Sequence, residues 1–483
     1  MRVMAVRRAL GRRLSSAAAA PAGLSELQQK NADHLWHPMT NQKAWTEGTA
    51  KAPPPVVKAR GVTLHRADGS TLIDGIGGLW CVNAGYGRSE LADVARDAMM
   101  DLAYLSPVMG SVPSIELAAK LGSMLQLDGG THVFFTASGS EANESAFKMA
   151  RMFHVVNEPA GALRYKIIAR HRAYHGNTLA TMAATGQAER KTGFGPMPGG
   201  YVHVSPPYPY RRHVKLTEEE HTDELIRQLD ECIQYEGKET VAAFIMEPFI
   251  SGGGVLIPGD DYLRKVRAVC DKHGVLLILD EVVSGFARTG KMFGHQHFGV
   301  KPDIMTMAKG LTSGYMPLAA IAASEKVFKA FQGTPSLPAR LGHFRQINTY
   351  GGHPVACAIA LKNIEILERE DLAGAARDMG EYLKQALRDA VGDCPFVGDI
   401  RGKGLLVGVE LVTDRATKEP LPEAVCAKLI GACAARGVIV GRNGSTIPGL
   451  CNVLIIAPPL VITKEECDTV VACIKAGLAE VVV

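Results

Sequence analysis

The sequence predicts an α/β protein with a large, mostly parallel sheet domain and a smaller α+β domain. First, its 483 residues are 47% hydrophobic and 21% charged, a globular composition whose length suits two or three domains. Second, short apolar runs alternate with helix-like stretches from Leu79 to Glu325. Third, these runs are apolar throughout, so each strand is expected to be buried on both faces, as in a parallel sheet covered by helices.

Residues 1–20 are expected to be a targeting leader. They hold five arginines and no acid, and the first carboxylate of the chain comes at Glu26. An Arg-rich, Ser-containing, acid-free start is typical of a mitochondrial or plastid transit peptide, and we expect the mature protein in the mitochondrial matrix. The alternatives are a disordered basic tail and a helix that lies on a membrane surface. Without this segment the formal charge of +4 falls close to zero, so no nucleic-acid partner is expected.

Residues 21–78 form an N-terminal segment that we expect to pack with the smaller domain. Three consecutive prolines at 53–55 precede two predicted strands, over 56–64 and 72–73, with a turn at Asp68-Gly69 between them.

The large domain is expected over residues 79–350. Its predicted strands are the apolar runs at 133–135, 165–169, 241–246, 275–279, 304–307 and 318–322. Helices are predicted in the intervals, over 141–154, 221–236 and 261–273.

The smaller domain is expected over residues 351–483. The pattern predicts helices over 354–369, 379–391 and 464–478 and strands near 405–411, 437–440 and 453–456.

The ten cysteines include no CxxC pair and no metal-ligand spacing. In a reducing compartment they are expected to be small core hydrophobes, not a disulfide framework. No apolar run approaches the roughly 18 residues needed to cross a bilayer. The sequence therefore predicts neither a bound metal nor a membrane partner.

Several predicted strands of the large domain end just before polar side chains. In open α/β sheets, ligands bind beyond the carboxyl ends of the strands. The residues that stand there are, in chain order, Gly139–Ser140, Tyr174, Glu247, Asp280 and Lys309. An anion cradle, an aromatic ring, two acids and an amine are thus expected at one rim of the sheet.

Each of these residues also has an ordinary structural interpretation. Ser140 and Asp280 could cap the helices that follow them. Lys309 could be an exposed loop lysine, and Tyr174 and Trp80 could be core or rim aromatics. Together, however, such side chains meet the needs of pyridoxal phosphate: a phosphate cup, a lysine for a Schiff base, a carboxylate at the ring nitrogen, and side chains against both ring faces.

The sequence resembles the class III, omega-type aminotransferases of the fold type I pyridoxal-phosphate family, from about Leu35 to Thr463. The matching motifs are SGSEAN at 138–143, YHGNT at 174–178, MEP at 246–248, LDEVVSGFARTG at 279–290, KPDIMTMAKGL at 301–311 and TYGGHP at 349–354.

The resemblance implies a role for each residue of the cofactor site. Lys309 would link the cofactor covalently and later shuttle the proton, and Asp280 would pair with the pyridine nitrogen. Val282 would pack against the ring and Tyr174 would stack on its exposed face. Gly139–Ser140 would hold the phosphate.

The resemblance also implies a dimer and a substrate site. Thr349 would reach the phosphate of the neighbouring subunit, so a homodimer with shared active sites is expected, or a tetramer built from such dimers. Arg442 would bind the keto acid's carboxylate through its fork of donors, and would swing aside or pair with Glu247 when an amine enters. For Arg442 the alternative is a surface arginine beside a flexible glycine loop.

Two departures from the family's motifs stand out, and one of them points to a branch of the family. Ala287 stands where the family often has glycine, a minor departure. Val283 stands where ornithine-type members carry glutamine, and with Trp80 it favours the branch that uses ω-amino acids with pyruvate. The implied donors are 4-aminobutanoate, β-alanine or taurine, and the implied acceptor is pyruvate or glyoxylate.

Other functions stay open at this point. A decarboxylase, racemase or aminomutase would use the same cofactor machinery. A non-enzymatic protein could use the Arg-rich leader to bind nucleic acid or an anionic membrane. A dinucleotide oxidoreductase is disfavoured because no GxGxxG follows the first strand of a βαβ unit.

Overall fold

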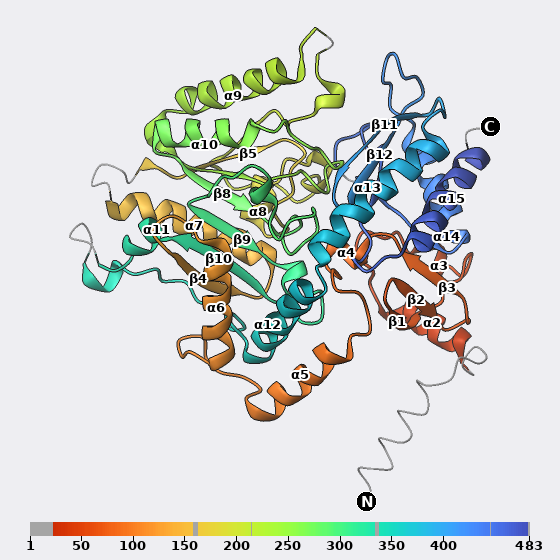
Figure 1. Cartoon of the computed structure of the whole chain (residues 1–483), viewed down its shortest axis with the longest axis horizontal. Coiled ribbons are helices and arrows are strands. Elements are labelled where there is room, and N and C mark those ends of the chain that lie inside the picture. Colours follow the sequence, from red (N-terminus) through yellow and green to blue (C-terminus); the bar gives the residue numbers. More distant parts are fainter. Residues whose placement is uncertain (1–22, 158–162, 214, 334–337, 445, 482–483) are drawn as a thin grey trace, which may run out of the picture.

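The computed structural model describes residues 23–157, 163–213, 215–333, 338–444 and 446–481 (Figure 1). The predicted leader lies outside the described residues. A large sheet with its helices occupies one side of the molecule, and two small sheets with helices α13 (Leu372–Val391), α14 (Glu423–Ala435) and α15 (Lys464–Val481) occupy the other.

The large sheet has seven strands in the order β4-β10-β9-β8-β7-β5-β6. Their bounds are β4 (Thr131–Thr136), β5 (Lys166–Arg170), β6 (Tyr201–Val204), β7 (Val241–Met246), β8 (Leu276–Asp280), β9 (Ile304–Met307) and β10 (Ala319–Ser324). The five strands from β9 to β6 are parallel, and β10 runs antiparallel to both of its neighbours. The predicted α/β class with a mostly parallel sheet is confirmed.

Helices cover both faces of this sheet. Along β8, Ile278 packs in the hydrophobic cluster of α7 (Gly139–Asn157), whereas Leu277 and Leu279 pack in the cluster of α9 (Glu218–Tyr235) and α10 (Tyr262–His273). Alternate side chains of one strand therefore enter two different cores, which explains why the strands are apolar at every position.

The N-terminal and middle regions of the chain contain further helices. They are α2 (Leu24–His34), α3 (Lys43–Thr46), α4 (Gly77–Trp80), α5 (Ser89–Asp101), α6 (Val112–Leu125), α8 (Leu179–Ala184), α11 (Glu325–Lys329) and α12 (Pro354–Arg369).

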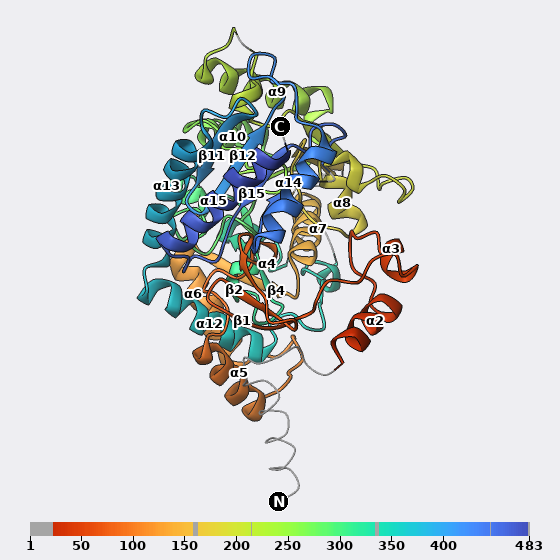
Figure 2. The same cartoon turned by 90° about the vertical axis from the view of Figure 1, so that its right-hand side faces the viewer.

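The small sheets join the two ends of the chain. One is β11-β12-β15-β14, formed by β11 (Val397–Lys403), β12 (Leu406–Leu411), β15 (Val453–Ile456) and β14 (Gly441–Arg442). The other is β1-β2-β3-β13, formed by β1 (Val56–Arg60), β2 (Thr63–Arg66), β3 (Thr71–Asp74) and β13 (Val438–Ile439). Because β3 pairs with β13, the N-terminal strands lie beside the C-terminal helices in both views (Figures 1 and 2).

Some element boundaries differ from the prediction. The single strand predicted over 56–64 is two strands, because Gly61, with φ +58°, turns the chain between β1 and β2. Helix α13 begins at Leu372, seven residues before its predicted start. Strands β6 and β11 were not predicted, since the polar and glycine residues of VGDIRGK mask the pattern of β11.

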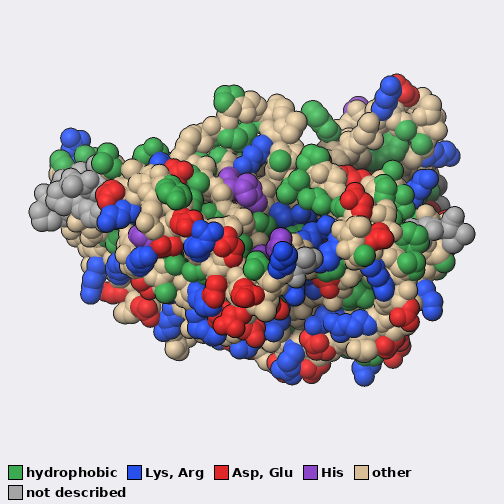
Figure 3. Space-filling view, turned by 90° about the horizontal axis from the view of Figure 1, so that it is seen from above, with side chains coloured by type: hydrophobic (Ala, Val, Ile, Leu, Met, Phe, Trp, Pro, Cys, Tyr) green, Lys and Arg blue, Asp and Glu red, His purple; other side chains and the backbone are tan. Residues whose placement is uncertain are grey.

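All ten cysteines are free thiols and seven of them are buried, so their predicted role as core residues is confirmed. In the described part of the chain no helix is both long and apolar enough to cross a membrane. Acidic and basic side chains are interspersed on the face seen in Figure 3.

Candidate active site

Asp280, the last residue of β8, is buried and held by a network of donors. Its Oδ2 accepts a hydrogen bond from Asn143 Nδ2 (2.8 Å) and lies 2.9 Å from Nδ1 of His175. Its Oδ1 accepts from the backbone N–H of Val282 (3.0 Å). Thr306 Oγ1, in β9, donates to Asn143 Oδ1 (2.7 Å) and so turns the amide nitrogen of Asn143 towards Asp280. These hydrogen bonds offset the free-energy cost of burying a carboxylate at the end of an apolar strand.

Lys309 begins a short 3₁₀ helix, η6 (Lys309–Leu311), just beyond β9. Its Nζ lies 4.8 Å from the centroid of the Trp80 ring. Burial lowers the pKa of Lys309, and the nearby carboxylates of Asp280 and Glu247 only partly oppose this. The structure therefore places a desolvated amine against an aromatic face and within the electrostatic influence of a buried acid, where a larger fraction is neutral and nucleophilic than for a surface lysine.

The residues of the predicted anion cradle lie in the first turn of α7. Ser138 Oγ accepts a hydrogen bond from the backbone N–H of Glu141 (3.3 Å), while the Glu141 carboxylate accepts from that of Ala137 (2.7 Å). The helix is thus capped by Ser138, and Ser140 is left for another role. Ser140 Oγ instead donates to Asn177 Oδ1 (3.0 Å) and accepts from the backbone N–H of Asn177 (3.2 Å).

Gly139 allows the close approach that this cradle needs. A β-carbon placed on Gly139 would lie 3.1 and 3.2 Å from the two methyl carbons of Val282. The bare glycine therefore packs directly against Val282, and the N–H groups at the start of α7 remain accessible to a phosphate.

Tyr174 and Glu247 are brought together at the neighbouring strand ends. The buried Glu247 accepts hydrogen bonds from the backbone N–H groups of Tyr174 (3.2 Å) and Ser251 (2.9 Å). Burial raises the pKa of Glu247, and burial likewise raises that of Tyr174. The guanidinium of Arg190 lies over the Tyr174 ring, 4.9 Å from its centroid.

The residues from 46 to 478 match the family described as Aminotransferase class-III. The chain belongs to this family. A taurine–pyruvate aminotransferase of Bilophila wadsworthia is 39% identical over 95% of this chain and 98% of its own. A putrescine–pyruvate aminotransferase of Pseudomonas aeruginosa is 36% identical over 94% of this chain and 96% of its own. A solved omega transaminase from Pseudomonas jessenii, in complex with PMP, has a TM-score of 0.86 and 35% identity, and covers 94% of this chain and 98% of that one.

The aminotransferase uses pyridoxal phosphate, and its site suits that cofactor. The buried Asp280 can face a pyridinium nitrogen, and Gly139 leaves room for a phosphate at the start of α7. Two buried nitrogens, Nε2 of His175 and Nε1 of Trp80, have no hydrogen-bond partner among the described residues. A bound cofactor or substrate can supply one.

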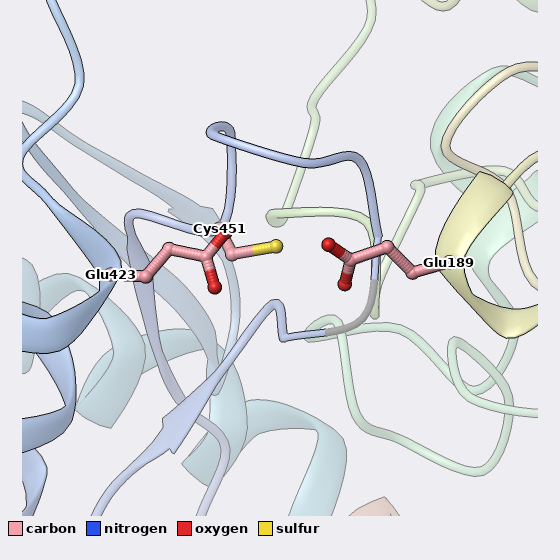
Figure 4. Close-up of side chains that lie close together, drawn as sticks. All are labelled: Glu189, Glu423 and Cys451. Carbon is pink, nitrogen blue, oxygen red and sulfur yellow. The ribbon is translucent and has the colours of Figure 1, made fainter.

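Arg442 of the aminotransferase lies in β14, beside Glu423. Its Nη1 is 3.6 Å from Glu423 Oε2 and 3.3 Å from the carbonyl oxygens of Glu423 and Cys451. The pairing with Glu247 that was expected for one stage of the reaction is not the arrangement found here. The side chains of Glu189, Glu423 and Cys451 point towards one another, with ligand-type atoms within 4.8 Å (Figure 4).

Thr349 lies apart from the other predicted site residues of its own chain. It is exposed, and its carbonyl oxygen accepts a hydrogen bond from the hydroxyl of Tyr104 (3.1 Å). Residues on either side of it in the chain, Ile347 and Gly351, line a pocket together with the exposed apolar side chains of Val108 and Met109.

Four residues around the site were not predicted from the sequence. Asn143 and His175 stand inside the motifs SGSEAN and YHGNT, so their presence was visible but their contact with Asp280 was not. Thr306 lies within an apolar strand and Arg190 within no motif, and neither gave a signal of its own.

Proposed function

We propose that the enzyme transfers the amino group of an ω-amino acid or ω-amine to pyruvate or glyoxylate. The observation that carries this proposal is the desolvated amine of Lys309, which lies against the Trp80 ring and feels the charge of the buried Asp280. The taurine–pyruvate and putrescine–pyruvate relatives support an amine whose nitrogen is remote from an acid group, with pyruvate as acceptor.

The cofactor-site residues divide the work of proton and charge handling. Bound pyridoxal phosphate supplies a sink for the electron pair released when the substrate loses a proton. Asp280, oriented by Asn143 and His175, holds a proton on the ring nitrogen. With the cofactor bound, Lys309 Nζ would take the proton from the amine-bearing carbon of the donor and would return it to the cofactor carbon that keeps the amino group.

The surrounding side chains bind and orient. Gly139–Ser140 and the N–H groups at the start of α7 hold the phosphate. Val282 and Tyr174 would hold the cofactor ring from its two faces, and Glu247 positions Tyr174 by accepting a hydrogen bond from the Tyr174 backbone N–H. The Trp80 ring, next to the Lys309 amine, forms one wall of the proposed substrate site.

Arg442 binds the carboxylate of the keto acid after leaving its position beside Glu423. Its present contacts, 3.3 to 3.6 Å long, are weak for an arginine, so a bidentate carboxylate can compete for the guanidinium.

The active unit is a homodimer with shared sites, in which Thr349 serves the phosphate of the partner subunit. The exposed apolar side chains of Val108, Met109 and Ile347, which line one pocket next to Thr349 in the chain, support this, since patches of this kind mark protein interfaces. Mixing Lys309→Ala subunits with Thr349→Val subunits tests it. A hybrid dimer contains one site with both native residues, so mixing restores activity, whereas a mixture no more active than its components contradicts shared sites.

The transfer reaction is tested by its two halves on purified holoenzyme. An ω-amine alone is expected to bleach the visible cofactor band, and pyruvate alone to restore it. A matrix of β-alanine, 4-aminobutanoate, taurine and putrescine against pyruvate, glyoxylate and 2-oxoglutarate identifies the pair.

Two outcomes would contradict the proposal. Amine consumption that does not depend on a keto acid would favour a decarboxylase, racemase or aminomutase. Normal turnover by Lys309→Ala would show that Lys309 is not the base.

A further inference from the structure

Arg190 presents a guanidinium that has no anionic partner among the residues that the structure describes. It is the last residue of the 3₁₀ helix η2 (Ala188–Arg190) and is half-buried. Its Nε donates to Gln187 Oε1 (2.6 Å), and its Nη1 lies 3.4 Å from the thioether sulfur of Met39. No salt bridge of Arg190 occurs within the described residues, so its two terminal nitrogens keep unused donors.

Glu189, the acid that directly precedes Arg190 in the sequence, forms no ion pair with it. The Glu189 carboxylate is directed at Glu423 and Cys451 instead (Figure 4). Arg442 differs in this respect, because it already has Glu423 as a counter-ion. A half-buried guanidinium without a counter-ion loses part of its hydration, and no ion pair compensates for that loss unless a ligand supplies the anion.

Arg190 also lies against Tyr174, one of the predicted residues of the cofactor site. Its guanidinium covers the ring of Tyr174, 4.9 Å from the centroid. Its partner Gln187 is buried, and a β-carbon on Gly252 would lie 3.9 Å from Gln187 Nε2 and 3.4 Å from Trp80 Cη2. The Trp80 ring in turn lies 4.8 Å from the Lys309 amine. Gln187, which accepts a hydrogen bond from Arg190, and Trp80, whose ring lies beside the Lys309 amine, therefore both lie near Gly252.

Gln187 fixes the direction of this charge. Its Nε2 donates to the carbonyl oxygen of Arg172 (2.9 Å), which leaves Oε1 to accept from Arg190. With Nε held and the planar group stacked on Tyr174, the terminal nitrogens form a pre-organised fork for a carboxylate or sulfonate.

We propose that Arg190 binds the acid group at the far end of an ω-amino acid donor, a carboxylate or a sulfonate, and thereby selects donors with an anionic tail. The inference rests on the proposed amine transfer and names the class of donor at that site. Gln187 acts as the positioning residue, while Arg442 is kept for the keto acid.

The test compares donors in the first half-reaction of the holoenzyme. β-Alanine and taurine carry the anionic tail, and 1-aminopropane is a similar chain without it. In Arg190→Gln, the ratio of kcat/KM for β-alanine to that for 1-aminopropane is expected to fall about 10- to 100-fold, as expected for loss of a charged hydrogen-bond pair. Most of the loss should appear in KM, and Arg190→Lys should recover part of it.

Arg151→Gln is the matched control. Arg151 also lies over a tyrosine ring, that of Tyr201 at 5.5 Å, and its Nε donates to the carbonyl oxygen of Tyr165 (2.8 Å). It stands twelve residues after Gly139 in α7, roughly 18 Å along the helix. This variant is expected to leave the donor ratio unchanged.

The outcomes separate the inference from the proposed function. An equal loss for all three donors in Arg190→Gln would assign Arg190 a structural role through Tyr174 and overturn the inference. A loss confined to the pyruvate half-reaction would also overturn it. A wild-type enzyme whose cofactor band no amine bleaches would refute the proposed transfer itself, and the inference with it.

Discussion

The contact between Gly139 and Val282 allows a quantitative prediction about the cofactor site. In Gly139→Ala, the new β-carbon meets the Val282 methyl carbons at 3.1 and 3.2 Å. Ordinary carbon contacts are about 3.5–4.0 Å, so the valine must move by a few tenths of an ångström. Overpacking of this kind costs about 1–3 kcal/mol. Because Val282 is expected to lie against the cofactor ring, cofactor affinity should fall about 5- to 150-fold.

Titration of the apoenzyme with pyridoxal phosphate, followed by the visible band, measures this loss. Val282→Ala removes both methyl groups, so the double variant should bind the cofactor more tightly than the two single effects predict, with a coupling energy of about 0.5–3 kcal/mol. Gly431→Ala is the control, since a β-carbon there meets nothing within 4 Å. It should leave affinity unchanged and stabilise α14 by about 0.5–1 kcal/mol. Native affinity in Gly139→Ala, or purely additive effects, would refute the reasoning.

Three further predictions concern backbone strain, the amine and the leader. Ala287 has φ +77°, a backbone conformation that glycine adopts with little strain. Ala356 is equally buried but lies in helix α12. Denaturant titration should therefore show that Ala287→Gly destabilises the fold by about 1–2 kcal/mol less than Ala356→Gly does. Because burial lowers the pKa of Lys309, covalent attachment of pyridoxal phosphate to the apoenzyme should rise with pH around a midpoint below about 10.4, and a midpoint at that ordinary value would contradict it. Residues 1–20 fused to a fluorescent protein should direct it to mitochondria, and a cytosolic or plastid signal would show that the leader has another role.

Much of the large sheet was predictable because its strands are buried on both faces. The apolar runs 241–246 and 304–307 match β7 and β9 residue for residue. Parallel strands also share one carboxyl edge, so the residues that follow them, such as Asp280 and Lys309, could be placed together before any contact was known.

Contacts that depend on packing were beyond such reasoning. The pattern of an apolar strand is the same in both directions, so β10 could not be assigned as antiparallel. The link from Thr306 through Asn143 to Asp280 joins three elements far apart in the chain, and composition does not report it. Arg190 becomes notable only once its neighbours are known to be a ring and an amide instead of an acid.

Left-handed backbone at the site connects these findings. Trp80, Lys309 and Ala287 have φ of +59°, +49° and +77°, a region that costs about 1–2 kcal/mol for residues other than glycine. The first two are in contact, the Lys309 amine over the Trp80 ring, so the strain lies where the amine is positioned. Such strain persists only when surrounding packing holds it, and it is typical of sites that must present a group in one orientation. The ends of the parallel strands therefore determine where the site lies, and the strained backbone at Trp80 and Lys309 helps to orient the Lys309 amine.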